Sequence, residues 1–214
     1  MCVRYFIDRD TKELAPFAER VALSPLCDRF RSKLGKSIKN EGEIGPMDIA
    51  PVIATSRGGA STVFPMQWGF NIKRTDLASS RDEVFTTVFN ARAESAGRRP
   101  AFAEAWRKHR CIVPASWYFE WEHALDPNGK KVRGERWSIQ PRGDTVTWLC
   151  GLYRMEEGLP RFVVLTREPS FELSKIHDRM PLMLPLEKVS AWIDPGSDPE
   201  EVSKAALERM ILWQ

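Results

Sequence analysis

The sequence predicts an α+β fold with a mostly antiparallel β core, either barrel-like or built from two sheets, and helices on its outside. Strand-like runs separated by short turns fill the second half, and segments with helical spacing of apolar residues lie nearer the two ends. Short turns join neighbouring strands in antiparallel order, because parallel strands need long crossovers. The 214 residues can bury one sizeable core, and we expect a single domain over residues 1–214.

The first half mixes helices and strands. The opening segment is rich in β-branched and aromatic residues, which favours a strand, and two segments with apolar residues every three or four positions follow it. A Gly58-Gly59 turn separates two apolar runs and indicates a hairpin. The expected elements are strand Cys2–Ile7, helices Lys12–Leu23 and Pro25–Leu34, loop Gly35–Pro51, strands Val52–Ser56 and Ser61–Phe70, polar segment Asn71–Glu83, strand Val84–Ala91 and helix Pro100–His109.

The second half is more strongly β. Glycine and proline punctuate five strand-like runs, and Pro127-Asn128-Gly129 is typical of a hairpin loop. Helices return near the end, where Asp198 stands at an N-cap position. The expected elements are strands Arg110–Pro114, Trp117–Glu122, Glu135–Gln140, Thr145–Tyr153 and Arg161–Thr166, and helices Ser170–Ile176, Leu186–Ile193 and Pro199–Leu212.

Composition describes an ordinary globular protein, with 43% hydrophobic and 29% charged residues. No apolar run is long enough to span a bilayer and the first residues do not resemble a signal peptide, so we expect a cytoplasmic protein without a membrane partner. The four cysteines are scattered without a C-x-x-C pair, which argues against disulfides and a zinc site. A net charge of +3 permits a polyanionic partner without requiring one.

Cys2 directly follows Met1, and aminopeptidases remove an initiator methionine when the second residue is small. The exposed cysteine would carry an α-amine of pKa about 7.7–8.0 beside a thiol of pKa about 8.5. The neutral amine can add to an aldehyde, and the thiol can close the imine into a thiazolidine ring. Taken alone, Cys2 fits better as an inert small residue at the start of a strand.

Glu120 lies in an aromatic segment whose residues alternate between two faces of a strand. Trp117, Phe119 and Trp121 share one face, which we expect to be core. On the opposite face, Glu120 is either a solvent-facing carboxylate or a partly dehydrated general acid on the wall of a cleft.

The same period of two places Asn90, Arg92 and Glu94 on one face of the next candidate. Arg92 could bind a phosphate with two hydrogen bonds, and Asn90 could hold a sugar or carbonyl oxygen. The alternative is a surface pair between Arg92 and Glu94 that contributes little.

His177 follows a short helix and precedes Asp178. An imidazole titrates near neutrality, so it can both donate and accept protons. A lone histidine is more often structural than catalytic, and Asp178 would then only orient it.

Together these segments resemble the SRAP (SOS response-associated peptidase) family over nearly the whole chain. Each motif is weak alone, but the ordered set at these spacings is specific. The motifs are Met1-Cys2-x-Arg4, Trp68-Gly69, Asn90-Ala91-Arg92-x-Glu94, Cys111-x-x-Pro114, Phe119-Glu120-Trp121, Thr166 after an apolar strand, and His177-Asp178-Arg179-Met180-Pro181.

The resemblance implies a DNA-damage protein that links its N-terminal cysteine to abasic sites in single-stranded DNA through a thiazolidine, with a self-processing peptidase activity that exposes the cysteine. It also implies the residue roles. Cys2, Asn90, Glu120 and His177 would be catalytic, and Arg4, Trp68, Arg92, Thr166 and Arg179 would contact DNA.

No metal or organic cofactor is implied, because the aminothiol is itself the reagent, and we expect a monomer. Two positions depart from the family pattern: Val3 stands where glycine is usual, and Asp48 where asparagine is usual. Two alternatives stay open, a cysteine peptidase acting on protein substrates and a non-covalent module that binds single-stranded DNA.

Overall fold

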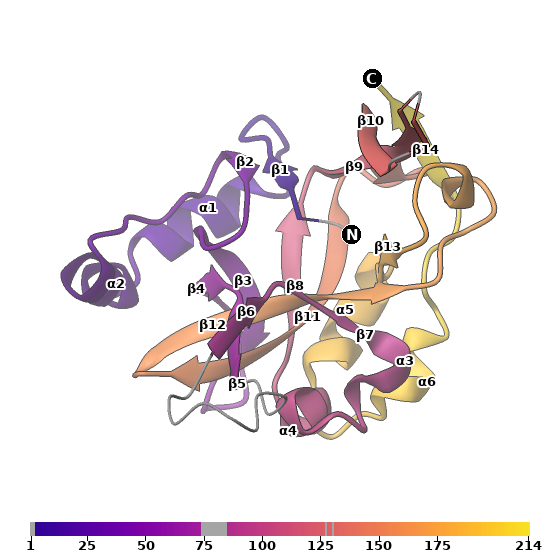
Figure 1. Cartoon of the computed structure of the whole chain (residues 1–214). Helices are drawn as coiled ribbons and strands as arrows, with labels where there is room; N and C mark the ends of the chain where they lie inside the picture. The colour runs from indigo at the N-terminus through magenta and orange to yellow at the C-terminus, as the bar shows by residue number, and fades with distance from the viewer. Residues whose placement is uncertain (1–2, 74–84, 127, 130) are drawn as a thin grey trace, which may run out of the picture.

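The computed structural model describes residues 3–73, 85–126, 128–129 and 131–214, which form two sheets, a two-stranded ribbon and several helices (Figure 1). The strands are β1 (Tyr5–Ile7), β2 (Gly42–Ile44), β3 (Ile49–Thr55), β4 (Ser61–Trp68), β5 (Phe70–Lys73), β6 (Phe85–Val88), β7 (Asn90–Arg92), β8 (Arg110–Ala115), β9 (Trp117–Leu125), β10 (Lys131–Pro141), β11 (Thr147–Glu156), β12 (Leu159–Arg167), β13 (Met180–Pro181) and β14 (Met210–Trp213).

Most strand pairs are antiparallel, and the larger sheet closes on itself. Its strands follow the order β11-β8-β3-β4-β12, and β12 pairs again with β11 to complete a barrel. β7 and β13 extend this sheet from β12, with β4 and β7 running parallel to β12. The second sheet has the order β14-β10-β9-β1-β2, and β5 pairs with β6. The predicted α+β fold with a barrel-like, mostly antiparallel core is confirmed.

The helices lie in two groups on the outside of the strands, α1 and α2 on one side and α3 to α6 on the other (Figure 1). Among the described residues, no helix combines the length and the apolar character needed to cross a membrane. The helices are α1 (Ala15–Ala22), α2 (Leu26–Leu34), α3 (Ala93–Ala96), α4 (Pro100–Lys108), the 3-10 turn η1 (Leu173–Lys175), α5 (Leu186–Ile193) and α6 (Pro199–Ser203).

The core fills the barrel. Every residue of β8 is buried, as are all residues of β12 except the last. Arg110 is also buried, and its guanidinium donates to the carbonyls of Trp106 at 2.8 Å and Trp192 at 2.7 Å. These bonds satisfy carbonyls at the ends of α4 and α5, which otherwise lack intrahelical partners. Arg110 therefore joins both helices to the barrel.

Most sequence-predicted elements are present, and α5 begins and ends where predicted. The predicted Asp198 N-cap is confirmed by its side chain, which accepts from the backbone N–H of Glu200. The expected strand Ser61–Phe70 is interrupted at Gly69, whose φ of +126° breaks it into β4 and β5. Parts of four predictions lie outside the described residues. They are strand Cys2–Ile7, polar segment Asn71–Glu83, strand Val84–Ala91 and the hairpin loop predicted from Pro127-Asn128-Gly129.

A predicted loop and a predicted helix are wrong. The expected loop Gly35–Pro51 contains β2 and the first residues of β3. The expected helix Pro199–Leu212 ends at Ser203, and its last residues form β14 instead. Leu212 pairs with Ile139 of β10 and Met210 with Pro141, so hydrogen bonds to a distant strand override the local helical pattern.

The expected core face of β9 is also wrong for its tryptophans. Trp117, Phe119 and Trp121 share a face as predicted, but the two tryptophans are only partly buried. Arginines of β10 cover this face, with the Arg136 guanidinium 3.8 Å from the Phe119 ring centre and that of Arg133 4.5 Å from the Trp121 ring centre. The opposite face turns inward, so Glu120 is only 4% exposed.

Gly151 of β11 has no room for a side chain. A Cβ atom there would lie 2.8 Å from the Val163 carbonyl oxygen and 3.0 Å from the Cys111 sulfur. We expect Gly151→Ala to lower the free energy of unfolding by about 1–3 kcal/mol, because the rigid sheet must shift to accept the methyl group. Urea denaturation measures this loss.

The matched control is Gly58→Ala in the β3–β4 turn, where a Cβ atom would meet only the Ser56 hydroxyl at 3.9 Å. We expect this change to stay within about 0.5 kcal/mol of the original stability. Equal effects of the two substitutions would contradict the packing described for β11.

Candidate functional site

A pocket of about 270 Å³ lies where β9, β10 and the segment after η1 meet. It brings together residues far apart in sequence, including the third residue of the chain and two residues that the sequence singled out. Its lining residues are Val3, Glu120, Trp121, Glu122, His123, Val132, Arg133 and His177.

Backbone hydrogen bonds hold the two sides of this pocket together. The N–H of His123 in β9 donates to the carbonyl of Ile176 at 3.1 Å, and the N–H of His177 donates to Leu173 at 2.9 Å. The first bond ties β9 to the segment after η1, and the second closes a turn around Ile176. As a result the Nε2 atom of His177 lies 3.9 Å from the Oε1 atom of Glu120.

Glu120 is a buried carboxyl group. Its Oε1 atom accepts from the backbone N–H of Trp121 at 3.4 Å, a long and weak hydrogen bond. Burial raises the pKa of Glu120, because a charged carboxylate loses solvation in the pocket. Glu120 is therefore protonated to a higher pH than an ordinary glutamate, as a general acid requires.

His177 is shifted in the opposite direction. Its pKa is lowered to about 4, chiefly by burial and in part by the nearby His123, while Asp178 opposes the shift. The N–H of Arg179 donates to Nδ1 at 3.0 Å, which favours the tautomer with its proton on Nε2, the nitrogen facing Glu120. Asp178 Oδ1, 2.8 Å from the same Nδ1, competes for that nitrogen and favours a proton there. The low pKa means that His177 is neutral at pH 7.

Arg179 joins His177 to the barrel. Its Nη2 atom donates to the Thr166 carbonyl at 2.7 Å and to Glu94 Oε2 at 2.9 Å, and its side chain is 11% exposed. Thr166 is fully buried and donates to the carbonyl of Ala91 at 3.4 Å. The structure thus connects two predicted DNA contacts, Thr166 and Arg179, and places both largely inside the protein.

The remaining predicted residues that the structure describes are not among those that line the pocket. Asn90 lies in β7 opposite Val164, and its buried Oδ1 atom has no hydrogen-bond partner among the described residues. Arg92 is exposed at the end of the same strand. Arg4 forms a 3.0 Å ion pair with Glu43.

Trp68 is a core residue in this structure. Its side chain is 0% exposed, its ring stacks on Phe162, and its Nε1 atom donates to the Phe89 carbonyl at 2.8 Å. No ring face is therefore open to a base or sugar. Cys2 lies outside the described residues.

Sequence reasoning missed His123 and Arg133 as pocket residues. The two lie opposite each other across the β9–β10 hairpin, so the predicted hairpin was the only signal for them. A register shift between Arg133 and Arg136 makes that pairing difficult to predict from the pattern of residues. His123, His177 and Asp178 also form a group that could hold a metal ion.

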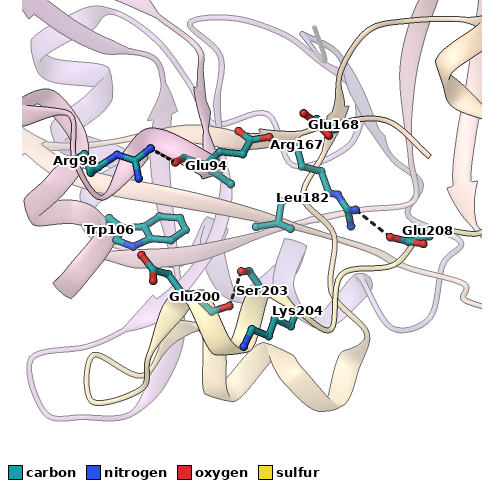
Figure 2. Close-up of a pocket in the computed structure, with 11 residues that line it drawn as sticks. Glu94, Arg98, Trp106, Arg167, Glu168, Leu182, Glu200, Ser203, Lys204 and Glu208 are labelled. Carbon is teal, nitrogen blue, oxygen red and sulfur yellow. Dashed lines mark hydrogen bonds and ion pairs between the residues drawn. The ribbon is translucent and has the colours of Figure 1, made fainter. Parts of the chain in front are cut away.

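A larger pocket of about 610 Å³ lies between α3 and α6 (Figure 2). Charged residues dominate its lining, and Arg167 forms a 3.0 Å ion pair with Glu208 there. None of the described residues that the sequence predicted as catalytic or DNA-binding lines it. We therefore take the smaller pocket as the candidate functional site, because it alone of the two holds the Glu120–His177 pair.

Solved structures support the fold. A crystal structure from Bacteroides thetaiotaomicron matches 99% of this chain and 91% of its own, with a TM-score of 0.68 and 20% identity. A phage-related protein from Bordetella bronchiseptica matches 99% of this chain and 93% of its own, with a TM-score of 0.66 and 18% identity.

Sequence comparison adds curated relatives and a family. The abasic site processing protein YoqW of Bacillus subtilis is 28% identical over 171 residues, covering 75% of this chain and 72% of the relative. The abasic site processing protein YMR114C of Saccharomyces cerevisiae is 33% identical over 133 residues, covering 60% of this chain and 34% of the relative. The model of the SOS response associated peptidase (SRAP) family matches residues 1–211. The chain therefore belongs to the SRAP family.

Proposed function

We propose that this protein processes abasic sites in single-stranded DNA by joining Cys2 covalently to the abasic sugar. The observation that carries the proposal is that Val3, Glu120 and His177 line one pocket. Val3 is bonded to Cys2, and adjacent Cα atoms are about 3.8 Å apart, so we propose this pocket as the place of reaction. Relatives named as abasic site processing proteins support the choice of substrate.

The first step of the proposed reaction forms a carbon–nitrogen bond. The Cys2 amine attacks the aldehyde of the ring-opened sugar, and the resulting hydroxyl leaves as water when the imine forms. Glu120 assists ring opening and protonates the departing hydroxyl, a role that its raised pKa supports. Asn90 positions the cysteine and the sugar.

The second step forms a carbon–sulfur bond. The Cys2 thiol adds to the imine carbon, its proton passes to the imine nitrogen, and a thiazolidine results. One water is lost over both steps. The neutral imidazole of His177 shuttles these protons, and its distance of 3.9 Å from Glu120 supports a role for both side chains in the same reaction.

Arginines on the surface supply the attraction for DNA. Arg92 is exposed, and Arg4 can exchange its surface ion pair with Glu43 for a phosphate, because such pairs are weak in water. The Arg179 side chain is held by Thr166 and Glu94, and its backbone N–H positions His177. The carboxylate of Asp48 is engaged locally, accepting from the Gly45 N–H at 2.8 Å and pairing with Lys39 at 3.3 Å.

Three other activities predict different outcomes. A self-processing peptidase would remove Met1 without an aminopeptidase, and a peptidase acting on other proteins would cleave a peptide library in a Cys2-dependent way. A non-covalent DNA-binding module would hold abasic and intact single strands equally after any change at Cys2.

Replacement of Cys2 separates amine chemistry from ring closure. We expect Cys2→Ala, purified with an untagged N-terminus, to give no heat-stable adduct with an oligonucleotide containing one abasic site. The alanine amine still forms an imine, so cyanoborohydride should trap a linked product. A denaturing gel measures both species.

The control for this variant is non-covalent affinity, which fluorescence anisotropy with an intact single strand measures. We expect Cys2→Ala and the unchanged protein to bind it equally. A heat-stable adduct formed by Cys2→Ala would refute the thiazolidine.

Glu120→Gln removes the proposed acid and keeps the shape of the side chain. We expect adduct formation to slow by about 10²–10⁴-fold, the usual contribution of general acid–base catalysis. The matched control is Glu122→Gln, which changes a carboxylate of the same pocket that accepts from Trp137 Nε1 at 2.8 Å. We expect nearly unchanged rates for Glu122→Gln, and similar losses in both variants would contradict the assigned role.

The protonation state of the His177 ring can be measured directly as a function of pH. We expect its ring to stay neutral from pH 7.5 to pH 5 and to titrate near its lowered pKa of about 4, because burial disfavours the imidazolium. The pKa of His177 in the folded protein lies below its unfolded value of about 6.5, so protonation of the ring favours the unfolded state. The contribution of His177 to stability is therefore complete above pH 6.5 and is lost as pH falls towards 4. Nitrogen–proton correlation spectra of the imidazole rings measure both ionisation and tautomer. A midpoint near 6.5 would show that the ring is solvated.

A further inference from the structure

Three side chains beside Glu120 form a set of donors that suits a transition metal. His123, His177 and Asp178 each offer one ligand atom, and these atoms lie within 4.8 Å of one another. The two imidazole ring centres are 4.2 Å apart, and Asp178 Oδ1 lies 2.8 Å from His177 Nδ1. The backbone bond from His123 to Ile176 fixes the strand and the turn that carry all three.

The ligand atoms lie near the spacing that a shared metal ion requires, and two of the three side chains must rotate to reach it. Zinc bonds of about 2.0–2.2 Å in a tetrahedral site place ligand atoms about 3.4 Å apart. His177 is buried and fixed, whereas His123 and Asp178 are exposed and can rotate towards it. Two imidazoles and one carboxylate suit Zn²⁺, Ni²⁺ or Cu²⁺ and do not suit Mg²⁺ or Ca²⁺, which prefer oxygen ligands.

A metal ion bound by these three ligands would keep one coordination position free for a further ligand. Both histidines line the 270 Å³ pocket, so a fourth coordination position would face the space where the sugar is proposed to react. Glu120 and Glu122 add carboxylates to the pocket wall and offset the guanidinium of Arg133.

We propose that a Zn²⁺-like transition-metal ion binds to His123, His177 and Asp178 and inhibits the protein. An ion coordinated by His177 occupies a nitrogen lone pair of the ring, so the imidazole can no longer shuttle protons. The ion is thus a regulator and takes no part in the reaction. Binding stands on the geometry alone, whereas inhibition rests on the proposed function.

Cobalt binding tests the site without relying on activity. Cys2→Ala protein is titrated with Co²⁺, because its missing thiol cannot act as a competing ligand, and the visible absorption of the bound ion reports the coordination. We expect one Co²⁺ per chain, and an affinity at least about tenfold weaker when His123→Gln or the exposed Asp178→Asn is added.

The matched control is His109→Gln, which changes the remaining histidine of the sequence, whose ring contacts Tyr153 instead. We expect it to bind Co²⁺ as tightly as the Cys2→Ala parent. No binding, or equal affinity after His123→Gln and His109→Gln, would refute the site.

Zinc inhibition of cross-linking tests the consequence. With the native N-terminus, we expect Zn²⁺ to slow adduct formation, EDTA to restore it, and His123→Gln to need at least about tenfold more Zn²⁺ for the same effect. Inhibition independent of His123 would place the ion on the Cys2 aminothiol and overturn the regulatory role. Absence of any adduct without metal would instead refute the proposed function, and the cobalt result would still decide the site.

Discussion

The register of the buried strand β12 is the constraint on which the site depends. β12 pairs with β11 and β4 to close the barrel, and with β7 and β13 beyond it. This register sets Asn90 opposite Val164 and Pro181 opposite Thr166, so both flanking segments are aligned against one strand. A shift of one residue would turn every side chain of β12 to the opposite face of the barrel wall. Because the side chains on both faces are buried, all of them would have to repack, and this opposes the shift. The position of Arg179, and through it that of His177, follows from this register.

Burial also suits two ordinary side chains to their proposed roles as acid and base. Loss of solvation disfavours the charged form of either group, so the pKa of Glu120 rises and the pKa of His177 falls. A protonated carboxyl group can then face a neutral imidazole within one pocket, and the pair can give and accept protons without a metal ion. Two exposed neighbours, His123 and Asp178, form with His177 a group that could hold a metal ion.

The sequence predicted the elements whose signals are local. The α5 boundaries, the Asp198 cap and the alternation of β9 follow from spacing and capping that neighbouring residues determine. It could not predict β14, because the strand exists through its pairing with β10, about 70 residues away. Which face of β9 is inside depends on Arg133 and Arg136 of β10, which cover the tryptophans.

In the candidate site, too, local sequence signals identify some residues and only the tertiary fold identifies the others. Glu120 and His177 were predicted as chemistry-bearing residues, yet only the tertiary fold brings them together. Trp68 was expected at the DNA surface, and its hydrogen bond to Phe89 instead holds it in the core. His123 carries no motif signal and enters the pocket through the hydrogen bond of its N–H to Ile176.

The most direct test of the account is the intact mass of the untagged protein after reaction with a single-stranded oligonucleotide that contains one abasic site. The account predicts one heat-stable species with the mass of the chain without Met1, plus the oligonucleotide, minus one water, with the modification located on Cys2 by peptide mapping. An unmodified chain that has lost Met1, or an adduct on another residue, would contradict it.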